Sequence, residues 1–185
     1  MNKHREIATL AGGCFWCTEA LFRRLKGVSS VLPGYTGGTV PNPTYEDVCE
    51  GNTGHAEAIQ ITFNPSQIPF EKILEIFFHT HNPTTLNQQD YDKGTAYRSA
   101  IFYHTDEQKI IAQKVKNETE KEKAYDNPIV TEIVPFTQFY VAEDYHKNYF
   151  DNNNTAPYCN VIIDPKIHKL LNLYGKNIKG EYMRQ

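Results

Sequence analysis

Two cysteines and two aromatic residues lie within four positions of this sequence, in the stretch AGGCFWCTEA of residues 11–20. The first thiol, Cys14, follows two glycines and stands where a helix over residues 14–25 is expected to begin. Helix N-termini present unpaired N–H groups and a partial positive charge, which stabilise a thiolate and lower the pKa of a cysteine. Cys14 is therefore a candidate nucleophile, against the alternative of a small buried side chain.

Cys17 lies one helical turn after Cys14, where the two sulfur atoms are close enough for a disulfide. This CxxC pair is compatible with a redox couple and also with part of a metal site, and its spacing leaves both open. The remaining cysteines, Cys49 and Cys159, are spaced too unevenly for a four-ligand zinc site, so we expect no metal.

The aromatic residues between the two thiols, Phe15 and Trp16, fall outside the helical stripe that carries the cysteines. At about 100° per residue, that stripe consists of Cys14, Cys17, Leu21 and Leu25. We therefore expect the two aromatic side chains to flank the thiol instead of forming the buried seam of their own helix.

One carboxyl group lies on the apolar face of the strand that we expect over residues 55–63. Glu57 alternates in register with Ile59, Ile61 and Phe63, so it shares their side of the strand. Burial disfavours the charged form of a carboxyl group and raises its pKa, which would make Glu57 a proton donor near neutral pH. The pattern fits equally well a strand that begins after Glu57 and leaves the carboxylate in water.

Tyrosines and a histidine are further candidates for a site. Tyr35, Tyr97 and Tyr158 occupy expected loops beside glycine turns or a cysteine, from which their hydroxyl groups could point into one pocket. His146 and Tyr149 lie one turn apart on a short expected helix and share a face, which is either part of a site or the packed side of that helix.

The whole chain has the composition of a folded protein. Its 185 residues suffice for one domain with a full core, and 39% of them are hydrophobic and 22% charged. The net charge of −3 offers no basic excess for nucleic acid, and no stretch approaches the roughly 20 apolar residues of a membrane helix. Because no signal peptide is recognisable either, we expect a cytoplasmic protein without structural disulfides.

Expected strands and helices alternate along the chain without repeats, which indicates a single α/β or α+β domain. Besides the elements named above, they are strands over residues 7–10, 28–31, 98–103, 129–134 and 138–141, and helices over 70–78, 107–123, 144–150 and from 165. Residues 33–38 are expected to form a glycine-rich turn, residues 39–48 a loop with one helical turn, and residues 82–96 a polar loop. The charged run of the helix over 107–123 is expected to be a solvated face.

Six motifs, long and in a fixed order, resemble those of the type A peptide methionine sulfoxide reductases. They are AGGCFWCTEALF, GYTGG, NPTYEDVCEGNTGHAEAIQITF, HNPTTLNQQDYDKGTAYRSAIF, AEDYHKNYF and PYC. The resemblance covers residues 7–169, so we expect a single reductase domain over 1–185 with its core at about 7–169. It implies an α+β fold, a two-layer α/β sandwich with a mixed sheet related to the ferredoxin-like arrangement.

The resemblance also implies an activity, the thiol-dependent reduction of the S epimer of methionine sulfoxide, free or in proteins. Cys14 would become a sulfenic acid, which condenses with a second thiol to a disulfide that thioredoxin reduces. No bound cofactor or metal is implied, and a monomer is the default expectation.

Roles for individual residues follow from the same resemblance. For the chemistry they are Cys14 as nucleophile, Glu57 as the acid, and Tyr35 and Tyr97 as hydroxyls that hydrogen-bond the sulfoxide oxygen. For substrate binding they are Phe15, Trp16, Asp92, His146 and Tyr149.

The sequence departs from the family pattern at position 17, which is more often glycine. Two candidates for the resolving thiol therefore exist, Cys17 and Cys159. Cys159 stands where many family members keep a recycling cysteine, in a C-terminal segment that can move, whereas Cys17 is held on a helix. This favours Cys159 slightly as the first resolving thiol, and a relay through both remains open.

Two other functions compete with this interpretation. A general dithiol–disulfide oxidoreductase using CFWC would exchange with protein disulfides and would not need Glu57 or Tyr35. A metal-binding module built from the cysteines and the HTH stretch, with His79 and His81, would retain stoichiometric zinc. Neither explains the ordered loops that carry glycine, tyrosine and glutamate.

Overall fold

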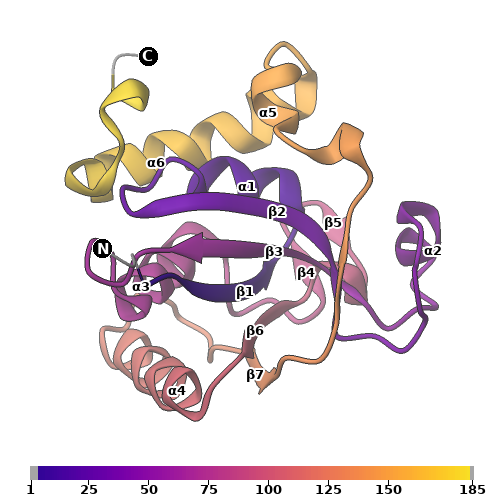
Figure 1. Cartoon of the computed structure of the whole chain (residues 1–185), viewed down its shortest axis with the longest axis horizontal. Helices are drawn as coiled ribbons and strands as arrows, with labels where there is room; N and C mark the ends of the chain where they lie inside the picture. Colours follow the sequence, from indigo (N-terminus) through magenta and orange to yellow (C-terminus); the bar gives the residue numbers. More distant parts are fainter. Residues whose placement is uncertain (1–3, 184–185) are drawn as a thin grey trace.

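Six strands form one mixed sheet through the middle of the molecule (Figure 1). The computed structural model describes residues 4–183, so both ends of the expected 1–185 domain lie outside it. The strand order is β7-β6-β1-β3-β2-β8, with β6 and β7 parallel and the other neighbours antiparallel. These strands are β1 (Glu6–Gly12), β2 (Val28–Thr36), β3 (Ala56–Phe63), β6 (Ser99–Tyr103), β7 (Glu132–Pro135) and β8 (Phe139–Val141).

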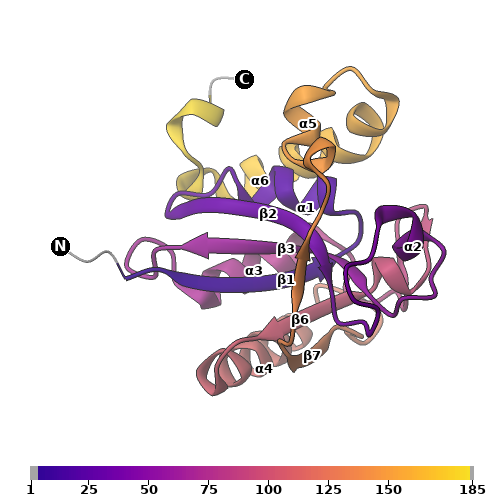
Figure 2. The same cartoon turned by 45° about the vertical axis from the view of Figure 1, so that its right-hand side comes forward.

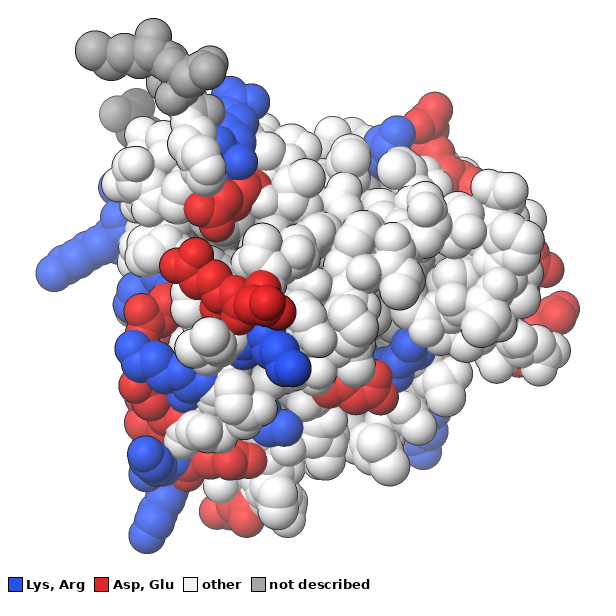
Figure 3. Space-filling view, turned by 60° about the horizontal axis from the view of Figure 1, so that its bottom comes forward, with Lys and Arg blue, Asp and Glu red and all other residues white. Residues whose placement is uncertain are grey.

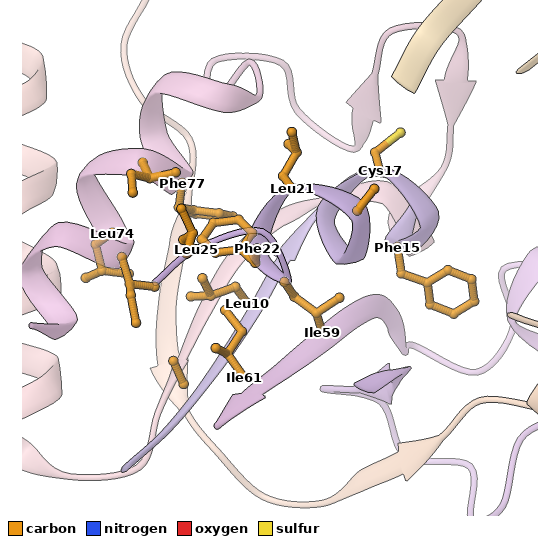
Figure 4. Close-up of a cluster of buried hydrophobic side chains, with 14 of the residues drawn as sticks. Leu10, Phe15, Cys17, Leu21, Phe22, Leu25, Ile59, Ile61, Leu74 and Phe77 are labelled. Carbon is orange, nitrogen blue, oxygen red and sulfur yellow. The ribbon is translucent and has the colours of Figure 1, made fainter. Parts of the chain in front are cut away.

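Helices cover one face of this sheet, which gives the two-layer α+β arrangement that the sequence predicts. They are α1 (Phe15–Phe22), α3 (Phe70–Thr80), α4 (Asp106–Lys121) and α6 (Asp164–Tyr174), with α6 packed on α1 and α3. Figure 4 shows Leu10 and Ile59 of the sheet facing Phe22 of α1 and Phe77 of α3. On the opposite face, alanines and Phe102 pack against Val134, Phe136 and Phe139.

Shorter elements border the end of the sheet at which α1 begins. They are α2 (Tyr45–Cys49), the hairpin β4 (Gln88–Gln89) and β5 (Asp92–Lys93), α5 (Tyr149–Asn152), the 3-10 turns η1 (Thr95–Tyr97) and η2 (Asp144–His146), and the π-helical turn η3 (Cys159–Ile163). The turns η4 (Gly175–Asn177) and η5 (Gly180–Tyr182) follow α6. Figure 2 shows the chain after β7 running past the sheet to α5, so late residues return to the start of α1.

Several sequence-based boundaries were wrong: the strand expected over 129–134 is β7, over Glu132–Pro135, and Tyr158 has helical backbone instead of lying in a loop. Tyr35 lies inside β2 and not in a turn, because the strand pairs with β3 on one side and β8 on the other as far as Thr36. Helix α1 starts after Cys14 and ends at Phe22, beyond which the Arg24 and Leu25 N–H groups bond to carbonyls three residues back. The helix expected over 144–150 is split into η2 and α5.

The charged run of α4 is a solvated face, as predicted. Lys and Arg side chains lie interleaved with Asp and Glu along one side of the molecule (Figure 3), and Lys114 pairs with Glu71 of α3 at 2.8 Å. Such exposed pairs contribute little to stability but leave no single-sign patch on this helix. Within residues 4–183, no helix has both the length and the apolar character needed to cross a bilayer.

The two glycines before Cys14 let the chain turn from β1 into α1. Gly13 has a φ of +88°, and a Cβ atom there would lie 2.6 Å from Cγ of Gln89. The Gln89 side chain is itself held, because its Oε1 accepts a hydrogen bond from the backbone N–H of Asn82 at 3.0 Å. Position 13 therefore requires glycine for its backbone conformation and for the close approach of the β4–β5 hairpin.

Gly13→Ala is expected to destabilise the protein more than Gly51→Ala, which serves as the matched control. Gly51 also has a positive φ, +79°, but its added Cβ would meet nothing within 4 Å. Each substitution should cost about 1–2 kcal/mol of backbone strain, and Gly13→Ala at least about 1 kcal/mol more for displacing Gln89. Urea unfolding of both variants measures the difference, and equal losses would contradict the argument from close approach.

Candidate active site

Cys14 lies at the N-cap of α1, between the sheet and the first turn of the helix. Its side chain is buried, and its carbonyl accepts hydrogen bonds from the N–H groups of Cys17 and Thr18 at 3.1 and 3.4 Å. Burial raises the pKa of Cys14 well above its ordinary value, and the neighbouring Cys17 thiol and the charge of Glu57 raise it further. The expected lowering of this pKa was wrong, because loss of solvation outweighs the field of one helix N-terminus.

The pKa of the Cys17 thiol is shifted in the opposite direction, below its ordinary value. Its pKa is lowered chiefly by a hydrogen bond from the Cys14 thiol, against the effect of burial, and the charge of Lys166 lowers it further. The Cys17 Sγ also lies 3.8 Å from the hydroxyl oxygen of Tyr158. Of the two thiols, Cys17 therefore loses its proton more readily than Cys14.

Cys159 begins the π-helical turn η3 and is fully buried. Burial raises its pKa, and the nearby Cys17 adds to the shift. The turn η3 packs on α1, so this third thiol belongs to the same end of the molecule as the CxxC pair. All four cysteines are free thiols, and Cys49 is the exposed one.

Glu57 is buried as the apolar alternation of its strand predicts. β3 begins at Ala56, and the Glu57 side chain is 1% exposed, which rules out the alternative that the strand starts later. Its Oε2 accepts a hydrogen bond from the backbone N–H of Phe15 at 3.0 Å. Burial raises its pKa to about 8, so Glu57 is a neutral acid at pH 7, next to the residue that follows Cys14.

Two of the predicted tyrosines face Glu57. Tyr35 is its direct cross-strand partner in the β2–β3 pair, so their side chains lie on the same face of the sheet. Tyr97, in η1, is half-buried, and its pKa is raised first by burial and then by the charge of Glu57. A carboxylic acid and two phenols thus surround the space beside the start of α1.

Trp16 and its neighbours form an aromatic wall. The Trp16 ring stacks on Tyr149 of α5 at 3.6 Å between centroids and 5° between planes. Its Nε1–H donates to His146 Nδ1 at 3.0 Å. The structure therefore brings together the predicted residues Trp16, His146 and Tyr149, although the last two lie on separate elements.

Phe15 differs from its prediction, because its side chain is fully buried instead of only flanking the thiol. Figure 4 shows its ring pointing away from the rest of the labelled core, on the other side of the first turn of α1 from Cys17. There it packs against Tyr35 and His146, with ring centroids 5.7 and 4.9 Å away. The periodicity of α1 missed this burial because the covering residues come from β2 and η2.

Asp92 joins the site through a tyrosine. The Tyr158 hydroxyl donates to Asp92 Oδ2 at 2.9 Å and also contacts Cys17. Burial raises the pKa of Asp92, and it also raises that of Tyr158. The hairpin strand β5, which carries Asp92, is thereby tied to the residue before Cys159.

The arrangement as a whole is a thiol pair and a neutral acid, enclosed by phenols and stacked aromatic rings. The sequence pattern described as "Peptide methionine sulfoxide reductase" matches residues 6–178 of this chain. The chain belongs to the peptide methionine sulfoxide reductase family.

Individual members of the family support this membership. The chain is 55% identical over 174 residues to peptide methionine sulfoxide reductase MsrA of Saccharolobus solfataricus, covering 94% of this chain and 97% of that protein. The reduced form of Mxr1 from Saccharomyces cerevisiae has a TM-score of 0.79 at 36% identity, over 86% of this chain and 91% of that one. Mxr1 in complex with Trx2 has a TM-score of 0.56 at 28% identity, over 80% and 87%. The family expected from the motifs is confirmed.

Two residues of the site were missed from the sequence, although both stand inside quoted family motifs. Tyr45 of α2 packs on Phe15 and His146, with centroids 6.4 and 4.6 Å away. Glu143, directly after β8, accepts a hydrogen bond from the Tyr35 hydroxyl. Their positions in NPTYEDV and AEDYH were the available signal, but no periodicity points to either side chain.

No group of three or more metal-ligating side chains occurs in the described part of this family member, from residue 4 to 183. Both ring nitrogens of His81, a histidine of the HTH stretch, have hydrogen-bond partners within the fold. Nδ1 contacts the Phe77 carbonyl at 2.6 Å, and Nε2 contacts the Ser99 hydroxyl at 2.8 Å. Burial lowers the pKa of His81 to about 4, so it is neutral at pH 7. Its role is to hold the helix end of α3 against β6.

The raised pKa of Glu57 predicts a pH-dependent stability. Between the unfolded pKa of about 4.3 and the folded value of about 8, the native state holds a proton that the unfolded chain has lost. The free energy of unfolding should therefore fall as pH rises through this window, by at most about 1.4 kcal/mol per pH unit. Unfolding of wild type and Glu57→Gln from pH 4 to 9 measures this. The prediction fails if both proteins show the same slope.

Proposed function

We propose that this chain reduces the S epimer of methionine sulfoxide, free or in proteins, to methionine. The observation that carries the proposal is the neutral carboxyl group of Glu57, hydrogen-bonded to the N–H of the residue after Cys14. A sulfoxide sulfur is a poor electrophile until its oxygen is hydrogen-bonded or protonated. The reaction therefore needs a thiol and an acid that is still protonated at neutral pH, side by side.

In the proposed reaction, the Cys14 sulfur attacks the sulfoxide while Glu57 gives its proton to the oxygen. The substrate S–O bond breaks, the oxygen passes to Cys14 as a sulfenic acid, and methionine leaves with two more electrons than the sulfoxide had. The proton that Cys14 loses replaces the one that Glu57 gave. Tyr97 donates a hydrogen bond to the oxygen as its charge changes, and Tyr35, which donates its own proton to Glu143, accepts one from the oxygen once it is protonated.

We propose that Phe15 and Trp16 form the wall that receives the methyl group of the substrate. Both rings are fixed before substrate arrives, Trp16 by Tyr149 and His146 and Phe15 by its burial. Asp92, His146 and Tyr149 border this pocket, Asp92 through its bond with Tyr158. A rigid aromatic pocket for a methyl group distinguishes the two epimers of the sulfoxide by shape.

Single-turnover reduction of a peptide containing either epimer of methionine sulfoxide tests this proposal. Wild type should release methionine from the S epimer alone, and Cys14→Ser should release none. Glu57→Gln should slow the step by roughly 10²- to 10⁴-fold, the usual loss on removing a general acid. Equal reduction of both epimers, or full activity without Cys14, would show that a different reaction takes place.

We propose that Cys17 forms the first disulfide with the oxidised Cys14 and that Cys159 receives it afterwards. The sequence favoured Cys159 slightly, but two observations support the other order. Cys17 lies one helical turn from Cys14, with the two thiols in contact, whereas Cys159 lies on η3 and burial raises its pKa. The sulfur that lies nearer to the sulfenic acid condenses with it first.

Mass mapping of the disulfide after one turnover decides the order. Cys159→Ser should still release one methionine and accumulate the Cys14–Cys17 disulfide, whereas Cys17→Ser should accumulate sulfenic acid first. Should Cys17→Ser form a Cys14–Cys159 disulfide as fast as wild type forms its own, Cys159 would be the first resolving thiol.

Thioredoxin is proposed as the protein that reduces the final disulfide. The structure of yeast Mxr1 with Trx2 supports this, because it shows such a complex for a related family member. A general dithiol oxidoreductase is the second candidate, favoured by the unequal pKa values of the CxxC thiols. It would reduce insulin disulfides and would keep that activity in Glu57→Gln.

A single domain, a monomeric state and a location in the cytoplasm complete the proposal. One sheet and one principal core run through the described residues, which supports a single domain. The proposed cycle needs Cys14, Cys17 and Cys159 to return to the reduced form, which a reducing compartment favours.

A further inference from the structure

One carboxyl group, that of Glu143, faces three different parts of the site. Its Oε2 accepts a hydrogen bond from the Tyr35 hydroxyl at 2.7 Å, and its Oε1 accepts one from the backbone N–H of Tyr45 at 2.9 Å. His146 Nε2 lies 3.5 Å from the same Oε2. Glu143 thus touches β2, α2 and η2, which border the site from three directions.

The protonation of His146 follows from its contact with Trp16. An indole N–H can only donate, so the His146 Nδ1 that receives it carries no proton. Burial lowers the pKa of His146, which keeps the ring neutral, and its one proton must then reside on Nε2. Nε2 is buried and has no hydrogen-bond partner within the described chain, and Glu143 is the carboxylate it faces.

All three groups directed at Glu143 are therefore donors: the Tyr35 O–H and the Tyr45 N–H form hydrogen bonds with it, and the His146 Nε2–H faces Oε2 at 3.5 Å without forming one. An ionised carboxylate is acceptor-only and suits all three at once. The pKa of Glu143 is lowered accordingly, since the hydrogen bonds from Tyr35 and from backbone N–H groups outweigh the effect of partial burial. A glutamine would turn an NH₂ group towards one of these donors and leave it unsatisfied.

The contacts of Glu143 link two functions that are otherwise separate. Through His146, they fix the indole of Trp16, the proposed wall of the methyl pocket. The Tyr35 hydroxyl donates its single proton to Glu143, so Tyr35 can only accept a hydrogen bond from the substrate oxygen, after Glu57 has protonated that oxygen.

We propose that Glu143 is a positioning residue, which orients Trp16 through His146 and the Tyr35 hydroxyl directly, and so aligns the methyl pocket with the oxygen site. This inference rests on the proposed function for its kinetic consequence. It assigns no contact of Glu143 with substrate.

A double-mutant cycle measures the part of this role that passes through Tyr35. Glu143→Gln should lower kcat/KM for methionine S-sulfoxide about tenfold, the effect of losing one hydrogen bond to a charged group. In the Tyr35→Phe background the same change should cost no more than about threefold, because the hydroxyl it orients is gone. A merely structural role would cost the same in both backgrounds.

Glu46→Gln is the matched control, because it removes a negative charge that also acts on His146 but leaves the three donors of Glu143 in place. It should keep kcat/KM within about twofold of wild type. The proposal is overturned if Glu143→Gln also stays within that range, or if its cost is equal with and without the Tyr35 hydroxyl.

Nitrogen NMR of the imidazole of His146 gives a readout that does not depend on activity. Wild type should show the neutral tautomer protonated at Nε2, and Glu143→Gln should show a mixture. The fluorescence of Trp16, the one tryptophan of the chain, should also shift in Glu143→Gln, because the indole N–H loses a fixed acceptor when the His146 tautomer becomes mixed. Glu143→Asp keeps an acceptor-only group and should keep the wild-type tautomer, which provides a folded comparison if the glutamine variant unfolds.

These two readouts separate the inference from the function it builds on. A wild type that reduces no sulfoxide would refute the proposed function, and the NMR result would still decide the role of Glu143. An unchanged His146 tautomer and unchanged Trp16 fluorescence in Glu143→Gln would refute the positioning role, whatever the activity of wild type.

Discussion

The hydrogen bond from the Phe15 N–H to the Glu57 carboxyl group joins the two halves of the site. It connects the first turn of α1, which carries the thiols, to β3, a strand inside the sheet. β3 pairs with β1 and β2 along most of its length, so Glu57 has a fixed place beneath the helix start. Because Cys14 directly precedes Phe15, this bond also holds Cys14 next to the sheet and close to Glu57. The proposed chemistry depends on this proximity of the thiol to the acid.

Loss of solvation sets the protonation states around this bond, with different results for neighbouring groups. It keeps Glu57 protonated at pH 7 and raises the pKa of Cys14. Cys17 is buried too, but a hydrogen bond from its partner thiol outweighs the cost of its negative charge. A buried site can therefore hold a neutral acid beside an ionisable thiol, provided that one sulfur donates a hydrogen bond to the other.

Residues from late in the chain complete the site by returning over α1. Glu19, on the same helix as the thiols, is buried and accepts the backbone N–H of Asn148 at 2.9 Å. Asn148 has a φ of +53°, and this turn separates His146 from Tyr149, so that one bonds the edge of Trp16 and the other stacks on its face. Arg24 lies between the rings of Phe150 and Tyr182, which ties the following segments to the same helix.

The sequence alone determined the burial of Glu57 and the order of the main elements, because alternation and helical spacing report which face of an element is apolar. Glu57 was found in this way from its place beside Ile59, and the family was found from six ordered motifs. Only the tertiary structure decided the direction of the Cys14 pKa shift, the burial of Phe15 and the place of Glu143. Each of these depends on which other segments of the chain pack against the side chain. The spacing of residues within one helix or strand does not show which distant segments these are.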